Sequence, residues 1–517
     1  MKTTILRAGA VRRIAALTTG LAMAAMMAAA GAVQAQEGSD TLNIALNGPP
    51  LSFDPARDDN GNGVIYTQLV YEPLIRAASD GTLQPGLATE WGYVGEGNKQ
   101  FEVKIREGAK FSDGTPVTTE AVAASLNYFV KNATGPTAAA FAGITATAVD
   151  ASTVSIATAQ DNPSLPELMN QIYLAGDIIA PAGLANPEAL ASAPIGAGPY
   201  VLDASATVSG DHYTYTANPE YWDKSAQHFK TIVVKVIPST TSALQALRTG
   251  QVDFMTGDAQ TVEAAKGANL QVFNGPQAWE GFFLIDRAGQ VVPAMGDVRV
   301  RQALNYAIDR EAIATALYGE YGSANVQPNT TGWDGYDPAL EGAYTYDPER
   351  AKALLAEAGY ADGFVLPVHY FAVGQTETMV QAVASQLEEV GVTMELKPNP
   401  DITAYVTDLL SKQFPVTSLT FGGQPQFVNI AQNWAATGVL NPFGVTDPAF
   451  VELYEQAASA SADEIDAKMK ATMKKVVEDA YTLPVAQIDA IYFAREGLDG
   501  IKLNPRGSRV NPLDWTP

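Results

Sequence analysis

Residues that could carry out catalysis are scarce in this chain of 517 residues. Its three histidines, His212, His228 and His369, lie far apart and lack the His-x3-His spacing of metal ligands. Neither a Gly-x-Ser-x-Gly nucleophile motif nor a Gly-x4-Gly-Lys-[Ser/Thr] phosphate loop occurs. The lack of cysteine excludes thiolate catalysis, disulfides and cysteine-bound zinc. The sequence therefore indicates no catalytic residue, no metal site and no cofactor.

Acidic side chains dominate the charge of the chain. There are 56 Asp and Glu residues against 32 Lys and Arg, which gives a net charge of −24. Such a balance argues against nucleic acid or an anionic membrane surface as a partner, because both require a basic surface. Some pair of carboxylates lies close together in any fold of this composition. An exported glycan or ester hydrolase therefore stays an alternative of another class.

The elements that would position a site follow an α/β pattern. Two strand–helix–strand units can be read from the spacing of apolar residues and from the glycines that end the helices. The first unit has the strands Thr231 to Ile237 and Val252 to Met255, with a helix between them that ends at Gly250. The second has the strands Phe364 to Phe371 and Val392 to Leu396, with a helix between them that ends at Gly391. Units of this kind build parallel sheets covered by helices.

Several helix starts carry a capping side chain. Thr118 is expected to cap a helix that follows the strand Phe101 to Ile105 and an Asp113-Gly114 turn. Three further capping residues are predicted, namely Asp297, Asp309 and Asp347, the last followed by Pro348 at the first helical position. Gly61-Asn62-Gly63 and Gly422-Gly423 are expected to be turns. Core packing and capping account for nearly all residues of these segments.

The first 35 residues have the pattern of a signal peptide. A basic start with four Lys or Arg residues precedes the apolar run Ile14 to Ala32, and Val33-Gln34-Ala35 offers small residues to a signal peptidase. We predict cleavage after Ala35, with an uncleaved membrane anchor as the alternative. Arg12-Arg13 leaves twin-arginine export open, although the general secretory route is favoured.

The mature chain is expected to reside in a Gram-negative periplasm. Cleavage removes four basic residues and no acidic one, leaving 28 Lys and Arg against 56 Asp and Glu, a net charge of −28. Without a cysteine the chain cannot carry the lipid that tethers many binding proteins. An exported protein without such an anchor must be retained by an outer envelope.

Six segments resemble signatures of one family, the periplasmic solute-binding proteins of ABC importers of the peptide/nickel group (family 5). In Phe101 to Leu126 the resemblance rests on Arg106, Gly108, Phe111, Asp113-Gly114 and Thr118. The other five segments are Thr82 to Trp91, Pro194 to Tyr200, Ala246 to Asp253, Val298 to Glu311 and Asp347 to Gly359. They occur in the family's order and span nearly the whole mature chain.

The resemblance implies an α/β fold, the two-lobed periplasmic binding protein clamp of type II, large class, with an additional inserted domain. The implied boundaries are 36–76, 194–275 and 492–517 for lobe I, 77–193 for the inserted domain, and 276–491 for lobe II. Two strands crossing between the lobes would act as a hinge, and ligand would be buried in the cleft. The implied function is non-catalytic. A monomer captures a small organic solute and delivers it to an inner-membrane permease, or, alternatively, reports it to a membrane receptor as a sensor subunit.

Aromatic and polar residues are the candidates for ligand contact that the resemblance suggests. Aromatic rings suit a cleft because they bury a large area at a small entropic cost. The candidates are Phe53, Trp279, Phe282, Phe421, Gly422, Gln424 and Trp434, with Phe283 and Gly423 beside them. The alternative for each aromatic residue is the core of its own lobe.

One position departs from the family pattern. Peptide-binding members usually carry Trp-x-x-Asp followed by Asp-Pro in this region, and the aspartate pairs with the α-ammonium group of the peptide. Here Gln424 stands at the acidic position. A buried ammonium group without a counter-charge costs on the order of several kcal/mol. We therefore expect an uncharged or anionic solute rather than a peptide with a free amino terminus. A di- or oligopeptide is the alternative, and nickel would require an organic chelator.

Overall fold

The computed structural model describes residues 40–58, 63–134 and 136–517. The predicted signal peptide, its cleavage site and the first two residues of the predicted Gly61-Asn62-Gly63 turn lie outside the described residues. Within the described ranges, no helix combines the length and the apolar character needed to cross a bilayer.

The largest element of the structure is one sheet of eleven strands. Its strands are β1 (Thr41–Leu46), β8 (Tyr200–Leu202), β9 (His212–Ala217), β10 (Thr231–Val236), β11 (Phe254–Thr256), β12 (Gln271–Leu284), β13 (Gly322–Ala324), β14 (Phe364–Phe371), β15 (Val392–Asn399), β16 (Val416–Gly422) and β17 (Thr482–Ala494). The strand order is β15-β14-β16-β12-β17-β11-β1-β10-β9-β8, and β13 pairs with β17 outside this path.

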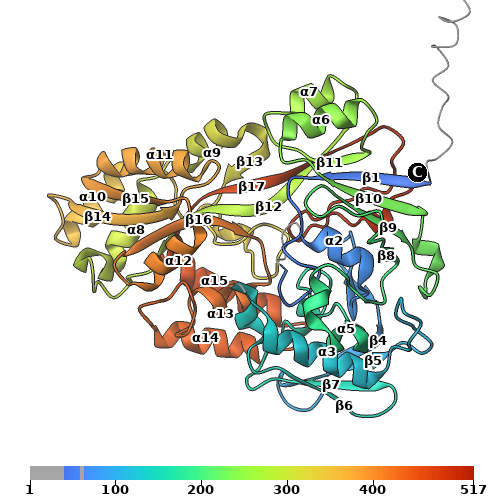
Figure 1. The fold of residues 1–517 in the computed structure, drawn as a ribbon. Coiled ribbons are helices and arrows are strands. Elements are labelled where there is room, and N and C mark those ends of the chain that lie inside the picture. Colours follow the sequence, from blue (N-terminus) through green and yellow to red (C-terminus); the bar gives the residue numbers. More distant parts are fainter. Residues whose placement is uncertain (1–39, 59–62, 135) are drawn as a thin grey trace, which may run out of the picture. The chain divides into compact units, whose positions relative to one another are not determined.

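The two longest strands, β12 and β17, lie side by side at the centre of the sheet (Figure 1). They pair antiparallel from Gln271↔Ala494 to Phe283↔Thr482, with register shifts between Pro276 and Ala278 and between Glu280 and Gly281. Beyond β17 the sheet continues through β11, β1 and β10, and beyond β12 it continues through β16, β14 and β15. These crossing strands therefore join two halves of one sheet.

Both predicted strand–helix–strand units are confirmed. β14 and β15 pair directly in parallel. β10 and β11 are parallel as well, but each pairs with β1, which lies between them. β11 begins at Phe254, two residues later than predicted.

A second sheet belongs to the region between Ala77 and Ala193. Its order is β4-β5-β7-β6, formed by β4 (Ala88–Tyr93), β5 (Gln100–Ile105), β6 (Thr145–Ala148) and β7 (Thr153–Ala157). Phe101, Val103 and Ile105 of β5 are buried in one hydrophobic core. β2 (Ile75–Ala77) and β3 (Leu83–Pro85) form a separate pair.

The helices are mostly short, and four of them begin at the capping residues that the sequence predicts. The α-helices are α2 (Gly63–Val70), α3 (Thr119–Asn132), α4 (Leu165–Leu168), α5 (Pro181–Ala185), α6 (Thr240–Arg248), α7 (Val262–Lys266), α8 (Val298–Tyr306), α9 (Arg310–Tyr318), α10 (Pro348–Glu357), α11 (Thr376–Glu388), α12 (Ile402–Leu410), α13 (Gln426–Asn433), α14 (Pro448–Ala458) and α15 (Ile465–Glu478). Thr118 accepts a hydrogen bond from the backbone N–H of Ala121 at 3.2 Å. Asp297, Asp309 and Asp347 accept from backbone N–H groups at 2.8, 3.0 and 2.8 Å. All four predicted caps are thus confirmed.

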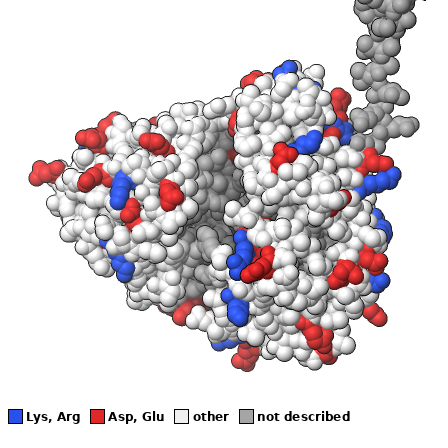
Figure 2. Space-filling view, in the orientation of Figure 1, with Lys and Arg blue, Asp and Glu red and all other residues white. Residues whose placement is uncertain are grey.

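On the face drawn in Figure 2, Lys and Arg side chains lie among Asp and Glu side chains, and no continuous basic patch is visible. This distribution agrees with the acidic composition.

Candidate functional site

A cavity of about 390 Å³ opens beside the two crossing strands, and we call it the crossing-strand cavity. Its lining residues come from both halves of the large sheet, from α2 and from the segments that follow β16 and β17. They are Leu46, Val64, Ile65, Thr256, Gln277, Ala278, Gly422, Gly423, Tyr492, Gly507, Arg509 and Val510. The cavity therefore brings together segments more than 400 residues apart in the sequence.

The strand ends explain why a cavity forms there. Leu46 ends β1 and Thr256 ends β11, and both strands run in the same direction. In α/β sheets, ligands bind outside the carboxyl ends of parallel strands, where the connecting loops leave space. Gly422 ends β16 opposite Ala278 of β12 and forms the facing wall.

Arg509 is the only described lining residue of this cavity with a charged or imidazole side chain; the others include no Asp, Glu, Lys or His. Tyr492 is 6% exposed, and burial raises the pKa of its hydroxyl, although the nearby Arg509 guanidinium acts in the opposite direction. The tyrosine therefore stays neutral at physiological pH. The described part of the lining thus includes one arginine and no carboxylate.

Two buried polar side chains, Trp333 and Thr330, lie behind Gly423. A Cβ added at Gly423 would lie 2.3 Å from Trp333 Nε1 and 2.4 Å from Thr330 Oγ1. Neither of these atoms has a hydrogen-bond partner among the described residues. Only glycine fits at position 423, so the wall of the cavity is held in close contact with the indole.

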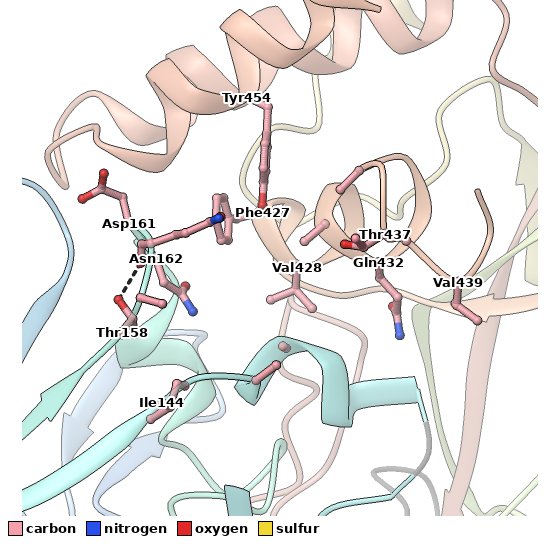
Figure 3. Close-up of a pocket in the computed structure, with 17 residues that line it drawn as sticks. Ile144, Thr158, Asp161, Asn162, Phe427, Val428, Gln432, Thr437, Val439 and Tyr454 are labelled. Atoms are coloured by element: carbon pink, nitrogen blue, oxygen red, sulfur yellow. Dashed lines mark hydrogen bonds between the residues drawn. The ribbon is translucent and has the colours of Figure 1, made fainter. Parts of the chain in front are cut away.

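A second cavity, also about 390 Å³, lies where η1 (Pro136–Phe141) and the loop after β7 face α13 and α14 (Figure 3). We call it the Figure 3 cavity. The rings of Phe427 and Tyr454 stack there with centroids 4.9 Å apart and an interplanar angle of 16°. Asp161 lines it too, and one oxygen of its carboxylate accepts from the backbone N–H of Asn98 at 2.7 Å.

The predicted aromatic residues mostly meet one another rather than the crossing-strand cavity. Trp279 and Phe421 stack with centroids 4.9 Å apart, because β12 and β16 place them opposite each other. Phe283 packs against both rings and stacks on Trp434 at 6.0 Å. The structure thus brings four of the aromatic candidates into one cluster, in which Trp279 and Trp434 are 1% exposed.

The remaining candidates lie in three different places. Phe53 is buried in another core, edge-to-face against Tyr66 and Tyr213. Phe282 points into the core shared with Leu284. Gly422 lines the crossing-strand cavity. Ligand contact by any of these residues stays a prediction.

Gln424 lies between the two cavities. It follows Gly423, a residue of the crossing-strand cavity, and its Nε2 donates to Oε1 of Gln432 at 2.9 Å. Gln432 lines the Figure 3 cavity. The amide side chain of Gln424 therefore forms a hydrogen bond with a residue of the Figure 3 cavity, while its neighbour Gly423 lines the crossing-strand cavity.

Sequence reasoning missed Arg509, Tyr492 and Thr256. One signal was available, since Pro505-Arg506-Gly507-Ser508-Arg509 combines turn-forming residues with two positive charges in an acidic chain. The position of this segment against β12 and β1 could not be read from local patterns.

The three histidines occupy separate sites. His369 is buried between Tyr405 and Phe414, and burial lowers its pKa to about 4. In the part of the chain that the structure describes, no three His, Asp or Glu side chains are placed to hold a metal ion.

Comparison with known proteins identifies the fold. The substrate-binding protein CtaP of an ABC transporter from Listeria monocytogenes is 21% identical, with a TM-score of 0.77 over 93% of this chain and 99% of its own. The murein tripeptide-binding protein MppA, in its unliganded open form, is 23% identical, with a TM-score of 0.74 over 93% and 97%. The predicted fold class, a two-lobed α/β clamp, is confirmed.

Sequence relatives and a family model agree with this result. The nickel-binding periplasmic protein of Escherichia coli is 23% identical over 482 residues, which cover 87% of this chain and 89% of that protein. A family model described as "Bacterial extracellular solute-binding proteins, family 5 Middle" matches residues 82–438, well over half of the chain. The chain therefore belongs to family 5 of the bacterial extracellular solute-binding proteins.

Proposed function

We propose that this periplasmic protein captures a small organic solute in the crossing-strand cavity and delivers it, as the substrate-binding component of an ABC importer, to the inner-membrane permease. It acts as a monomer, without turning the solute over, after cleavage behind Ala35. The domain boundaries are those implied by the family resemblance.

The observation that carries the proposal is the lining of the cavity by both halves of the sheet and both crossing strands. A solute held there would contact residues from both halves of the large sheet, the parts that approach each other when a clamp closes.

The direct test is to identify the solute that the purified protein carries. Mass spectrometry of the denatured protein should release one dominant compound. Adding that compound to protein stripped of ligand should raise the melting temperature, because a ligand that binds only the folded state stabilises it. Hydrolysis of the compound by the protein would instead support an exported hydrolase.

Filling the cavity should reduce this stabilisation. A Cβ added at Gly422 meets no atom within 4 Å, so leucine at this position has room to project into the cavity. We expect Gly422→Leu to weaken binding of the extracted solute at least about tenfold, or about 1.4 kcal/mol. Isothermal titration calorimetry measures this loss.

Gly342→Leu is the matched control, because Gly342 is exposed and an added Cβ there also meets no atom within 4 Å. Its affinity should equal that of the wild type. Equal affinity of Gly422→Leu and the wild type would place the solute elsewhere, with the Figure 3 cavity as the next candidate.

Peptide uptake is the second candidate function, because a relative from Sinorhizobium fredii, 26% identical over 414 residues, is described as a probable peptide-binding protein. The crossing-strand cavity has no carboxylate among its described lining residues to pair with a peptide ammonium group. Tight binding of unmodified di- or tripeptides to the wild type would contradict our choice.

Gln424→Asp should move the preference toward amines. The change breaks the 2.9 Å hydrogen bond to Gln432 and introduces a negative charge at the cavity boundary. We expect binding of the extracted solute to weaken about threefold to tenfold and some affinity for primary amines to appear. Gln381→Asp makes the same chemical change at an exposed position of α11 that lines neither cavity, and it should leave binding unchanged.

A further inference from the structure

The Figure 3 cavity is built by two regions that are far apart in the chain. The loop after β7 and η1 form one wall, and α13 and α14 form the other (Figure 3). Asn98, between β4 and β5, joins the two regions, because its side-chain NH2 group donates to the backbone carbonyls of Ala458 and Ala460 at 2.8 Å each. Asn98 is 6% exposed, so these bonds are shielded from water. The end of α14 is thereby attached to the region that contains β4 and β5.

The same asparagine also holds the opposite wall. Its backbone N–H donates to one carboxylate oxygen of Asp161 at 2.7 Å, and its carbonyl accepts from Asn162 N–H at 3.0 Å. Asp161 and Asn162 both line the cavity. One residue thus connects both walls, so the cavity has its shape before a ligand enters, which lowers the entropic cost of binding.

The interior of this cavity presents mainly uncharged groups. Asp161 is the only Asp, Glu, Lys, Arg or His among its described lining residues. Figure 3 shows the Asp161 carboxylate turned away from Phe427 and Val428, and one of its oxygens is already engaged by Asn98 N–H. A charged ligand would therefore lose its hydration here without gaining a counter-charge, which is costly for a buried ion. The lining argues against ammonium and carboxylate compounds.

Uncharged hydrogen-bonding groups lie among the apolar ones. Tyr454 reaches from α14 toward α13 with its hydroxyl at the end, and Figure 3 shows no hydrogen bond from this hydroxyl to the other residues drawn. Burial raises the pKa of the hydroxyl, so it stays neutral at physiological pH. Asn162 and Thr437 add an amide and a second hydroxyl to the lining. Such groups both donate and accept, as alcohol hydroxyls do, whereas a purely apolar ligand would leave them unpaired.

From these observations we propose that the Figure 3 cavity is a second binding site, and that it holds a ring of an uncharged carbohydrate. A sugar ring combines an apolar C–H face, which suits the stacked rings of Phe427 and Tyr454, with a rim of hydroxyl groups. The Tyr454 hydroxyl and the Asn162 amide can bond to that rim. The volume of about 390 Å³ lies in the range of small-molecule sites. This site is additional to the proposed function, because it does not depend on which solute the crossing-strand cavity takes.

Sugars that share one ring skeleton but differ in charge test the proposal. Protein stripped of ligand by unfolding and refolding is titrated in a calorimeter with glucose, galactose and cellobiose. The comparison compounds are the corresponding uronates, which carry a carboxylate, the 2-amino sugars, which carry an ammonium group, and cyclohexanol, which lacks the hydroxyl rim. We expect at least one neutral sugar to bind, and its charged and apolar analogues to bind at least about tenfold more weakly.

Two pairs of variants locate the sugar. Tyr454→Phe removes only the hydroxyl and should weaken binding of the neutral sugar about threefold to tenfold, whereas Tyr346→Phe, at an exposed tyrosine, should bind as the wild type does. Ala431→Phe fills the cavity from α13 and should weaken binding at least about tenfold. Ala356→Phe makes the same change at an exposed position of α10 and should leave binding unchanged. If Ala431→Phe does not fold, the two tyrosine variants carry the comparison.

The outcomes separate this inference from the proposed function. The inference would be overturned if no neutral sugar bound, or if the charged analogues bound as tightly as the neutral sugars. Sugar binding that neither Tyr454→Phe nor Ala431→Phe weakens would also overturn it, because the sugar would then lie elsewhere. The solute of the crossing-strand cavity is identified independently, by mass spectrometry and by Gly422→Leu, so none of these results decides the importer role.

Discussion

Gly423→Ala is expected to destabilise the protein by about 1–3 kcal/mol, the usual cost of forcing an extra methyl group into a packed site. The added Cβ would overlap Trp333 Nε1 at 2.3 Å and Thr330 Oγ1 at 2.4 Å, and both side chains are buried. The backbone at Gly423 or the indole must therefore move. Since Gly423 also lines the crossing-strand cavity, solute affinity should fall together with stability. Chemical denaturation and calorimetric titration measure the two effects.

Gly422→Ala is a control one residue away. Its Cβ would meet no atom within 4 Å, so the free energy of unfolding should stay within about 0.5 kcal/mol of the wild-type value. Equal stability of the two alanine variants would show that Trp333 does not restrict position 423.

Asp177→Asn is expected to stabilise the protein at neutral pH, because the buried carboxyl group must hold a proton in the folded state that the unfolded chain releases, whereas asparagine is neutral in both states. Asp177 is 1% exposed, and neither oxygen of its carboxyl group has a hydrogen-bond partner among the described residues. Burial raises the pKa of this carboxyl well above its usual range, and the neighbouring carboxylates of Glu72 and Asp58 add to the effect.

The sign of the pH dependence follows from this pKa. An aspartate in the unfolded chain titrates near about 3.9, whereas the folded state holds its proton to higher pH. The wild type therefore loses stability as the pH rises above about 4, because the unfolded state releases the proton more readily. The variant has no such group, so the stability difference between variant and wild type should be smallest at pH 4 and grow toward pH 7.

Denaturation of both proteins between pH 4 and pH 8 measures this difference, with Asp463→Asn as the control at an exposed position. A difference that does not change with pH would show that Asp177 titrates normally in the folded state.

Local features of the fold could be predicted from the sequence because local interactions determine them. A capping side chain such as Asp347 bonds to an N–H only three residues away, so its role follows from adjacent sequence. The parallel pairing of β14 with β15 follows in the same way from one strand–helix–strand unit. The fold class came from family signatures, because apolar periodicity does not specify how distant segments combine.

The candidate site was less accessible to sequence reasoning because strand register and long-range order determine it. The pairing of Trp279 with Phe421 depends on how β12 aligns with β16, and a shift by one residue would turn these rings to the other face. Similarly, the insertion of β1 between β10 and β11 brings Leu46 and Thr256 to one edge. No local pattern contains the information that Arg509 belongs to the same cavity.

The central position of β17 has a consequence for how the chain folds. This strand is the last of the large sheet to be synthesised, yet it pairs with β12, β11 and β13. Until Thr482–Ala494 docks, β12 and β11 each present an unpaired edge, which is a template for association with other chains. Such late, long-range pairing slows folding and prolongs exposure of these edges. Refolding yield should therefore depend strongly on protein concentration.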